Sequence, residues 1–169
     1  MTNTAVQELK TKVDAAWANL ARQLRGMELY LERSDAPGEW TTRQVLAHLM
    51  FEDGWNPVEV LKGFGEGDLP LIEIEPGRMV LTPARRAMTL GQLVDALDAQ
   101  RRSVLAYLEA LPEGDLQRRK ARIPLFKRFM ASDEVPIAVY VGGLFGSHWG
   151  DHAGQLAKIR KTVGLPEAT

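Results

Sequence analysis

The feature that most constrains the fold is a helical spacing of apolar residues that starts, in three places, just after the same short signal. In each place a threonine is followed three residues later by glutamine: Thr4/Gln7, Thr41/Gln44 and Thr89/Gln92. This pair can cap two free backbone donors reciprocally at the start of a helix. The pattern therefore predicts three helix starts.

Apolar residues recur at helical spacing after each signal and again near the end of the chain. The predicted helices run from about residue 5 to 28, from Thr42 to about Val60 with a bend or end near Pro57, from Leu90 to before Pro112, and from about Pro136 to Val163. Lysine and arginine in the last turns, followed by Gly164, mark the end of the fourth helix. Four amphipathic helices indicate an all-α fold.

The stretch 63–88 carries four glycines and three prolines and has no sustained apolar period. It is typical of a long crossover, here with some extended structure, between the second and third helices. We therefore expect a four-helix bundle with one long connection. A chain of 169 residues suits one domain spanning 1–169.

Composition narrows the function classes. Lysine and arginine total 21 against 22 acidic residues, so no excess of positive charge favours nucleic acid or an anionic membrane as partner. There is no cysteine, so any thiol chemistry needs a thiol from another molecule. The N-terminus does not resemble a signal peptide and no apolar run reaches membrane-spanning length, so a cytoplasmic location is expected.

The chain has three histidines, and two of them lie four residues apart in the last predicted helix. On a wheel of 100° per residue, His148 and His152 differ by about 40°, so one face presents both imidazoles for chelation of one ion. The run His148-Trp149-Gly150-Asp151-His152 lacks the glutamate of zinc proteases, which excludes the metalloprotease interpretation.

The third histidine, His48, lies on the apolar face of the second predicted helix with Val45 and Leu49. A single histidine on such a face is more often a hydrogen-bonded core residue than a ligand. Three histidines on inward faces, two of them at chelating spacing, instead predict one divalent metal ion held by His48, His148 and His152. Three imidazoles leave a coordination position open, which is the arrangement of catalytic zinc sites.

Two segments resemble those of the DinB-like or YfiT-like bundle family. One is Glu39-Trp40-Thr41-Thr42-Arg43-Gln44-Val45-Leu46-Ala47-His48-Leu49, and the other runs from His148 through His152 and Gln155 to Arg160. The resemblance implies that the three histidines are the metal ligands. It also implies a metal-dependent activity, because characterised relatives include thiol-dependent isomerases and thiol transferases. Residues 115–135 show no pattern of that family.

Four further residues are candidates for the site. Glu52 is interpreted as a fourth ligand, a general base or an acceptor that orients an imidazole, against the alternative of a surface ion pair. Gln155 shares the histidine face and is predicted to bind substrate or a ligand. Trp55 and Trp40 are expected to wall the pocket or fill the core, and Trp55 is predicted, with Gln155, to bind substrate. Asp151 lies off the histidine face, which favours a role outside the ligand set.

Glycines recur every four residues opposite the histidine face, at Gly142, Gly146, Gly150 and Gly154. Mid-helix glycine is costly, so this stripe indicates close helix approach, either within the bundle or across a homodimer interface. The basic residues Arg118, Arg119, Lys120, Arg122, Lys127 and Arg128 form a cluster that could hold an anion, although a solvated loop is the commoner explanation.

Two functions remain open. The first is a metal-dependent enzyme, a thiol transferase or a hydrolase, acting on a small-molecule substrate with or without a low-molecular-weight thiol as co-substrate. The second is a non-catalytic bundle that binds metal or a ligand as a stress-response or sensor protein, which a closed ligand set completed by Glu52 would favour. Zinc or nickel suits three imidazoles best, with iron, copper or manganese as alternatives.

Overall fold

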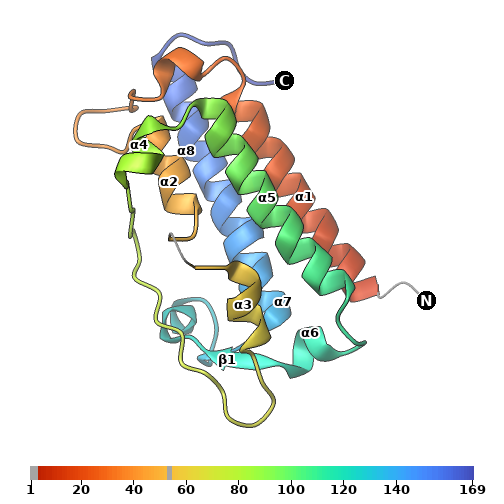
Figure 1. The fold of residues 1–169 in the computed structure, drawn as a ribbon. Coiled ribbons are helices and arrows are strands. Elements are labelled where there is room, and N and C mark those ends of the chain that lie inside the picture. Colours follow the sequence, from red (N-terminus) through yellow and green to blue (C-terminus); the bar gives the residue numbers. More distant parts are fainter. Residues whose placement is uncertain (1–3, 53–54) are drawn as a thin grey trace.

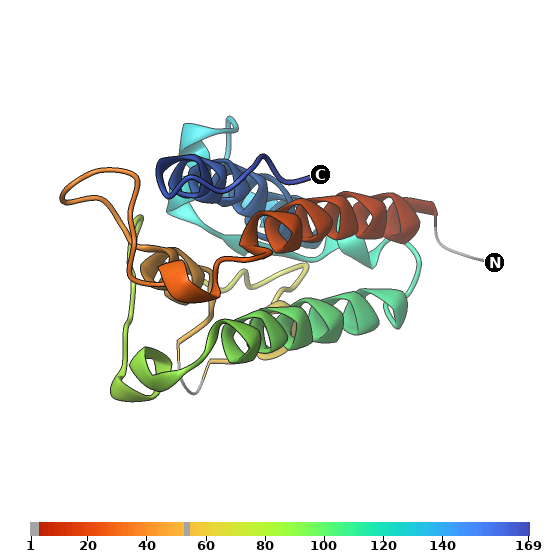
Figure 2. The same cartoon turned by 90° about the horizontal axis from the view of Figure 1, so that it is seen from above.

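The computed structural model describes residues 4–52 and 55–169 and is predominantly helical. Three long helices, α1 (Thr4–Leu24), α5 (Leu90–Glu109) and α8 (Trp149–Thr162), run side by side in both views (Figures 1 and 2). Their apolar faces, with Val13, Leu97 and Leu156 fully buried, form the main core. The all-α prediction is confirmed.

Two of the three predicted helix-capping pairs are present as reciprocal hydrogen bonds. At the start of α2 (Thr42–Leu49), the backbone N–H of Gln44 donates to Thr41 Oγ1 at 3.2 Å, and the N–H of Thr41 donates to Gln44 Oε1 at 2.8 Å. Thr89 and Gln92 repeat both bonds before α5. Thr4 is itself the first residue of α1, and the residues before it lie outside the described part of the chain.

The prediction of one helix from Thr42 to about Val60 is wrong. Helix α2 ends at Leu49, and α3 (Pro57–Lys62) is a separate helix. The side chain of Asn56 caps the start of α3. The side chain of Gln100 on α5 donates to the carbonyl of Leu49 at 3.2 Å and accepts from the amide of Phe51 at 3.0 Å. Since α5 supplies partners for these backbone groups, the helix can stop there. Residues 53 and 54, which the prediction included, lie outside the described residues.

The short helix α2 nevertheless occupies the expected place. It contacts α5 and α8, and α1 contacts the same two helices, so each of the four packs on two neighbours (Figure 2). The first helix is shorter than the predicted 5–28. Its end at Leu24 is followed by Gly26, whose φ of 74° a helix does not allow, and by the single turn η1 (Glu28–Tyr30).

The last predicted helix is continuous but not uniform. It consists of α7 (Ile137–Val141), the π-helical segment η3 (Gly142–His148) and α8. A π-helix has more residues per turn than an α-helix, so positions before His148 are rotated away from the faces that a uniform 100° wheel assigns. Such segments often occur at functional sites.

The first half of the glycine stripe faces α1. A Cβ on Gly146 would lie 2.9 Å from Cε of Lys12, and one on Gly142 would lie 3.4 Å from Leu9. These two glycines therefore serve helix packing within the chain. A Cβ on Gly150 or Gly154 would meet nothing within 4 Å, and Gly154 is exposed.

The crossover runs along the outside of the helices and ends in α4 (Pro83–Ala87) (Figure 1). As expected, part of it is extended: Gly65 and Leu71 form isolated bridges to Lys120 and Arg122. Lys120 and Arg122 are the first and last residues of β1 (Lys120–Arg122), which pairs antiparallel with β2 (Glu134–Pro136). Helix α6 (Asp115–Arg118) precedes β1 and the turn η2 (Pro124–Arg128) lies between the strands.

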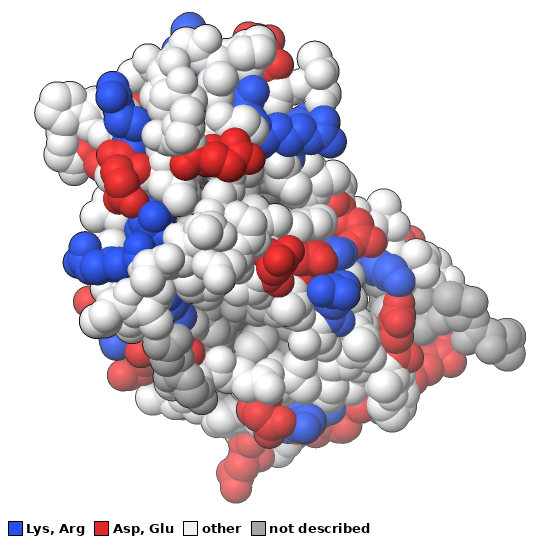
Figure 3. Space-filling view, turned by 45° about the horizontal axis from the view of Figure 1, so that its top comes forward, with Lys and Arg blue, Asp and Glu red and all other residues white. Residues whose placement is uncertain are grey.

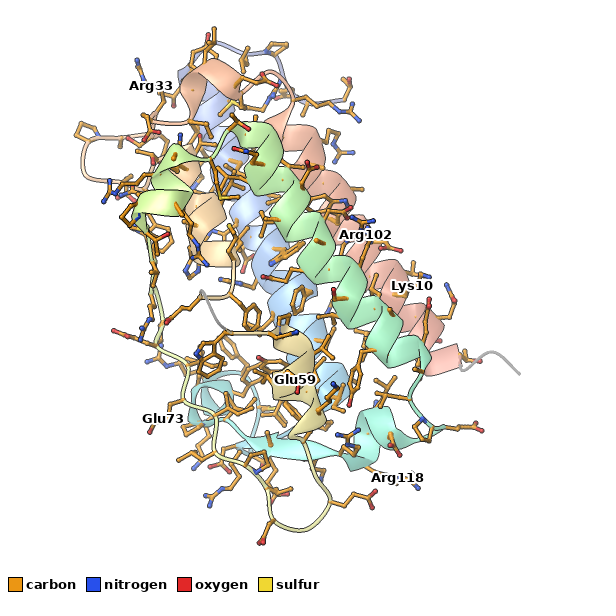
Figure 4. All side chains as sticks on the ribbon, viewed as in Figure 1. Lys10, Arg33, Glu59, Glu73, Arg102 and Arg118 are labelled. Carbon is orange, nitrogen blue, oxygen red and sulfur yellow. The ribbon has the colours of Figure 1, made fainter. Side chains whose placement is uncertain are left out.

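Most of the predicted basic cluster has a structural role. The guanidinium of Arg119 donates to the carbonyls of Leu61 and Lys62 at the end of α3 and of Phe64 just after it. Four others form ion pairs with nearby carboxylates: Arg118, Lys120, Arg122 and Lys127. Figure 4 shows Arg118 beside α6, well separated from α2.

Positive and negative side chains alternate over the described surface in Figure 3, and no continuous basic area covers that face. This agrees with the near balance of charges in the sequence. Among the described residues, no helix is both long and apolar enough to cross a membrane.

Candidate metal centre

The three histidines converge from three different segments. His48 lies in the last turn of α2, His148 ends η3 and His152 lies one turn into α8. Nε2 of His148 is 2.9 Å from Nε2 of His48 and 3.1 Å from Nε2 of His152. Nitrogens bound tetrahedrally to one ion at zinc distances would be about 3.3 Å apart. The three rings thus point the same nitrogen at one small volume.

Backbone and side-chain acceptors decide which ring nitrogens carry hydrogen. Nδ1 of His48 lies 2.6 Å from the carbonyl oxygen of Arg78, which can only accept, so Nδ1 is the donor. Nδ1 of His152 lies 2.8 Å from Oε1 of Gln155 and donates in the same way. A neutral imidazole has one N–H, so Nε2 of both rings presents a lone pair toward His148.

Without an ion, the three Nε2 atoms cannot all form hydrogen bonds with one another. A hydrogen on Nε2 of His148 could point at His48 or at His152 but not at both, which leaves at least one lone pair facing another nitrogen. A cation between the rings would be attracted to all three lone pairs. Histidines that bind metals usually donate the other ring N–H to a carbonyl or a side chain, as His48 and His152 do here. The donor set fits a divalent ion.

Burial favours the neutral form of His148 and His152, which is the form that binds a metal. It lowers the pKa of His148 to about 4, and the positive charges that His152 and His48 would carry add to the effect. Burial also lowers the pKa of His152, against the opposing influence of its hydrogen bond to Gln155. Trp40 packs on the outer side, its ring nearly parallel to that of His152 with centroids 6.2 Å apart. This indole restricts the ring of His152 and excludes water.

Two adjoining cavities reach the histidines, and five residues line both: His48, Ile74, Glu75, Leu144 and His148. The Trp55 cavity, of about 550 Å³, is further lined by Phe51, Glu52, Trp55, Arg78, Gln100 and Tyr140. The Phe129 cavity, of about 800 Å³, is further lined by Lys12, Phe126, Arg128, Phe129, Met130 and Val139. Both volumes are in the range of small-molecule sites.

Glu52 lines one of the two cavities that reach the histidines. Because α2 stops at Leu49, Glu52 is not on the helix face of His48; it lines the Trp55 cavity and forms an ion pair with Arg78. Among residues 4–52 and 55–169, the group of potential ligands consists of the three histidines without Glu52.

The two residues predicted to bind substrate have different places. Trp55 is 59% exposed and lines the cavity named after it, so it walls a pocket and does not fill the core. Gln155 lines neither cavity. Its side-chain oxygen instead accepts a hydrogen bond from Nδ1 of His152. Asp151 is exposed and lines the Phe129 cavity.

Arg78 is the residue that the sequence interpretation missed. Its carbonyl accepts from His48, and its side chain pairs with Glu52 and Glu75. It belongs to the crossover, where no periodic pattern indicates what a residue contacts. A backbone carbonyl is also present at every position, so no sequence signal could have singled it out.

Comparison with known families agrees with this geometry. The family model described as the DinB superfamily matches residues 7–156, a range that contains all three histidines. No curated protein and no solved structure matches the chain.

Proposed function

The chain belongs to the DinB superfamily, and from this premise we propose that it is a metal-dependent enzyme that acts on a small molecule through His48, His148 and His152. The observation that carries the proposal is the convergence of three Nε2 atoms, two of which are lone-pair acceptors because their Nδ1 atoms already donate. The contacts of α1, α2, α5 and α8 support a four-helix bundle in one domain as its framework.

Thiol transfer and hydrolysis are the reactions that this donor set would serve. A divalent ion held there supplies Lewis acidity, which lowers the pKa of a thiol or of water and polarises an electrophile. Zinc and nickel suit three imidazoles best. In the transfer reaction a thiol gives up its proton, its sulfur forms a bond to an electrophilic carbon, and the proton ends on the leaving group or on the neighbouring carbon.

We assign proton transfer to Glu52. Its carboxylate lines the Trp55 cavity with His48 and His148 and is held by the guanidinium of Arg78. An ion-paired carboxylate at the wall of the cavity can accept the proton that the nucleophile releases and return it to the product. Glu52→Gln should therefore lower turnover while metal content stays the same; a large loss of metal would make it a ligand instead.

Metal analysis of tag-free protein tests the metal site. Wild type should carry close to one zinc or nickel ion per chain, and His48→Ala, His148→Ala and His152→Ala should each lose most of it, since two imidazoles bind far more weakly than three. The matched control is Gln7→Ala on the exposed side of α1. Equal, low metal in wild type and the three histidine variants would rule out the site.

The non-catalytic alternative has a specific requirement, which is a ligand set closed by protein. Within the described residues no carboxylate completes the histidine group, and the nearby Glu52 is engaged by Arg78. Two cavities also reach the imidazoles. These observations favour catalysis over metal storage or sensing.

We also propose that the protein forms a homodimer through Gly150 and Gly154, the half of the glycine stripe that does not pack on another part of the chain. Gly154→Leu should shift a dimer toward monomer in light scattering and leave the far-ultraviolet circular dichroism unchanged, because a Cβ there meets nothing within 4 Å in the same chain. Gly146 is unsuited to this test because it packs on Lys12. A monomeric wild type at high concentration would contradict the proposal.

A further inference from the structure

The Phe129 cavity is a second organic-ligand site beside the histidines. We propose that it binds the uncharged, apolar or aromatic part of the electrophilic substrate, while the Trp55 cavity takes the more polar co-substrate. The inference rests on the proposed function and deepens it, because two ligands that meet at one centre imply group transfer between two organic molecules. Hydrolysis would need only one organic ligand and water.

Exposed apolar side chains are the first argument. Phe129 after η2 is 77% exposed and Val139 on α7 is 39% exposed, and both line the same cavity as the buried Phe126. The rings of Phe126 and Phe129 meet edge to face with centroids 6.4 Å apart, and Met130 adds a polarisable thioether. Large apolar groups gathered around a cavity are typical of a binding site and uncommon on a plain surface.

Charge is the second argument, because it narrows the ligand class. The ionisable groups around the Phe129 cavity are mixed in sign: Lys12 and Arg128 against Glu8, Glu75 and Asp151. This mixture gives no strong preference for an anion or a cation, so apolar contact decides what binds.

Both cavities are lined by ionisable groups of mixed sign, but the Trp55 cavity has further polar groups beside the histidines. It contains the ion pair of Glu52 with Arg78 and the side chain of Gln100 beside the wall formed by Trp55 and Phe51. A polar molecule that carries both donors and acceptors can be recognised by this lining.

Continuity with the histidines is the third argument. His48, His148 and Leu144 line both cavities, so a group in either one faces the same two imidazoles. A thiol sulfur brought in from the Trp55 side and an electrophilic carbon brought in from the Phe129 side would meet there. The sulfur–carbon bond forms as the thiol proton leaves, and the leaving group departs or the adjacent carbon takes up a proton.

The binding of N-phenyl-1-naphthylamine, an uncharged aromatic fluorophore, tests the site without requiring activity. We expect the wild-type protein to bind one equivalent, both with metal and after chelation. Val139→Arg should weaken the binding at least tenfold by placing a charged side chain in the cavity, and Phe129→Ser should weaken it several-fold. The control Leu29→Arg changes a leucine that is 90% exposed and lines neither cavity, and it should bind like wild type.

A second titration tests whether both cavities can be filled together. Cobalt-loaded protein mixed with 2-mercaptoethanol should keep its sulfur-to-cobalt absorption when the fluorophore is added at saturation, because the ligands occupy different cavities. Displacement of the thiol would show one shared site and overturn the proposal, as would unchanged fluorophore binding in Val139→Arg and Phe129→Ser. Absence of binding, together with a dimer that Val139→Arg dissociates, would assign the surface to a second copy.

Failure of the proposed function can be told apart from these outcomes. Protein without metal affinity that still binds the fluorophore at the Phe129 cavity would refute the metal enzyme and leave the apolar site in place. Protein that binds metal but not the fluorophore would refute only the second site.

Discussion

The candidate centre depends on individual hydrogen bonds as much as on the histidines. The backbone carbonyl of Arg78 accepts the ring hydrogen of His48, and the side-chain oxygen of Gln155 accepts that of His152. Both ring hydrogens therefore lie on Nδ1. Without these two bonds either ring could carry hydrogen on Nε2, where it would compete with metal binding. Single acceptors outside the ligand set therefore control whether the nitrogens are ready to bind.

Substituting Gln155 tests this control. Gln155→Leu removes the acceptor of the His152 ring hydrogen and should lower metal affinity roughly 10- to 100-fold, while His152 itself remains. Competition with a coloured chelator gives the affinity. Gln7→Leu on α1 is the matched control and should leave it unchanged. Equal affinity in Gln155→Leu and wild type would show that the hydrogen bond does not orient the ring.

Short helix α2 carries one of the three ligands, so its ends matter. The reciprocal Thr41/Gln44 cap fixes its start, and Gln100 on α5 binds backbone groups at its end. The sequence correctly predicted the cap because its donors and acceptors are three residues apart. The end was missed because its partner lies on another helix.

Two capping threonines allow a matched test of the element. Thr41→Ala and Thr89→Ala should each lower the free energy of unfolding by about 1 kcal/mol, measured by urea denaturation, because each removes one reciprocal cap. Thr41→Ala should also weaken zinc binding, since it loosens the helix of His48. Thr89→Ala removes the cap of α5, which carries no histidine, and should leave zinc binding unchanged. If both variants bind zinc equally well, the cap of α2 has no influence on the metal site and the prediction is wrong.

At the scale of the whole molecule, we expect a core that does not depend on metal. The apolar faces of α1, α5 and α8 contribute to one core, in which Leu20, Leu93 and Trp149 are almost fully buried. A core of this size is stable without a structural ion, unlike the core of a zinc finger.

Metal removal should therefore leave the fold intact. The chelated protein is expected to keep its far-ultraviolet circular dichroism and to melt roughly 5–10 °C lower, which corresponds to the loss of about 2.7 kcal/mol when free metal was present at 100 times its dissociation constant. Activity with an electrophile and a thiol should vanish and return with zinc or nickel. Unfolding on chelation would make the ion structural.

The sequence by itself determined the helices with strong apolar periods, the two reciprocal caps and the chelating pair His148 and His152. All of these depend on spacings of three or four residues, which helical geometry converts directly into contacts. The apolar face of α2 likewise placed His48 inward. Local geometry was sufficient wherever both partners lie on one helix.

Only the tertiary structure decided the rest. It ended α2 at Leu49 through Gln100, brought Arg78 from the crossover to His48, and placed Glu52 and Trp55 in a cavity wall. It also packed Gly142 and Gly146, in a π-helical segment, against α1. These contacts join residues 30 or more positions apart or depend on backbone irregularity. Their energies arise from packing, for which a one-dimensional pattern carries no signal.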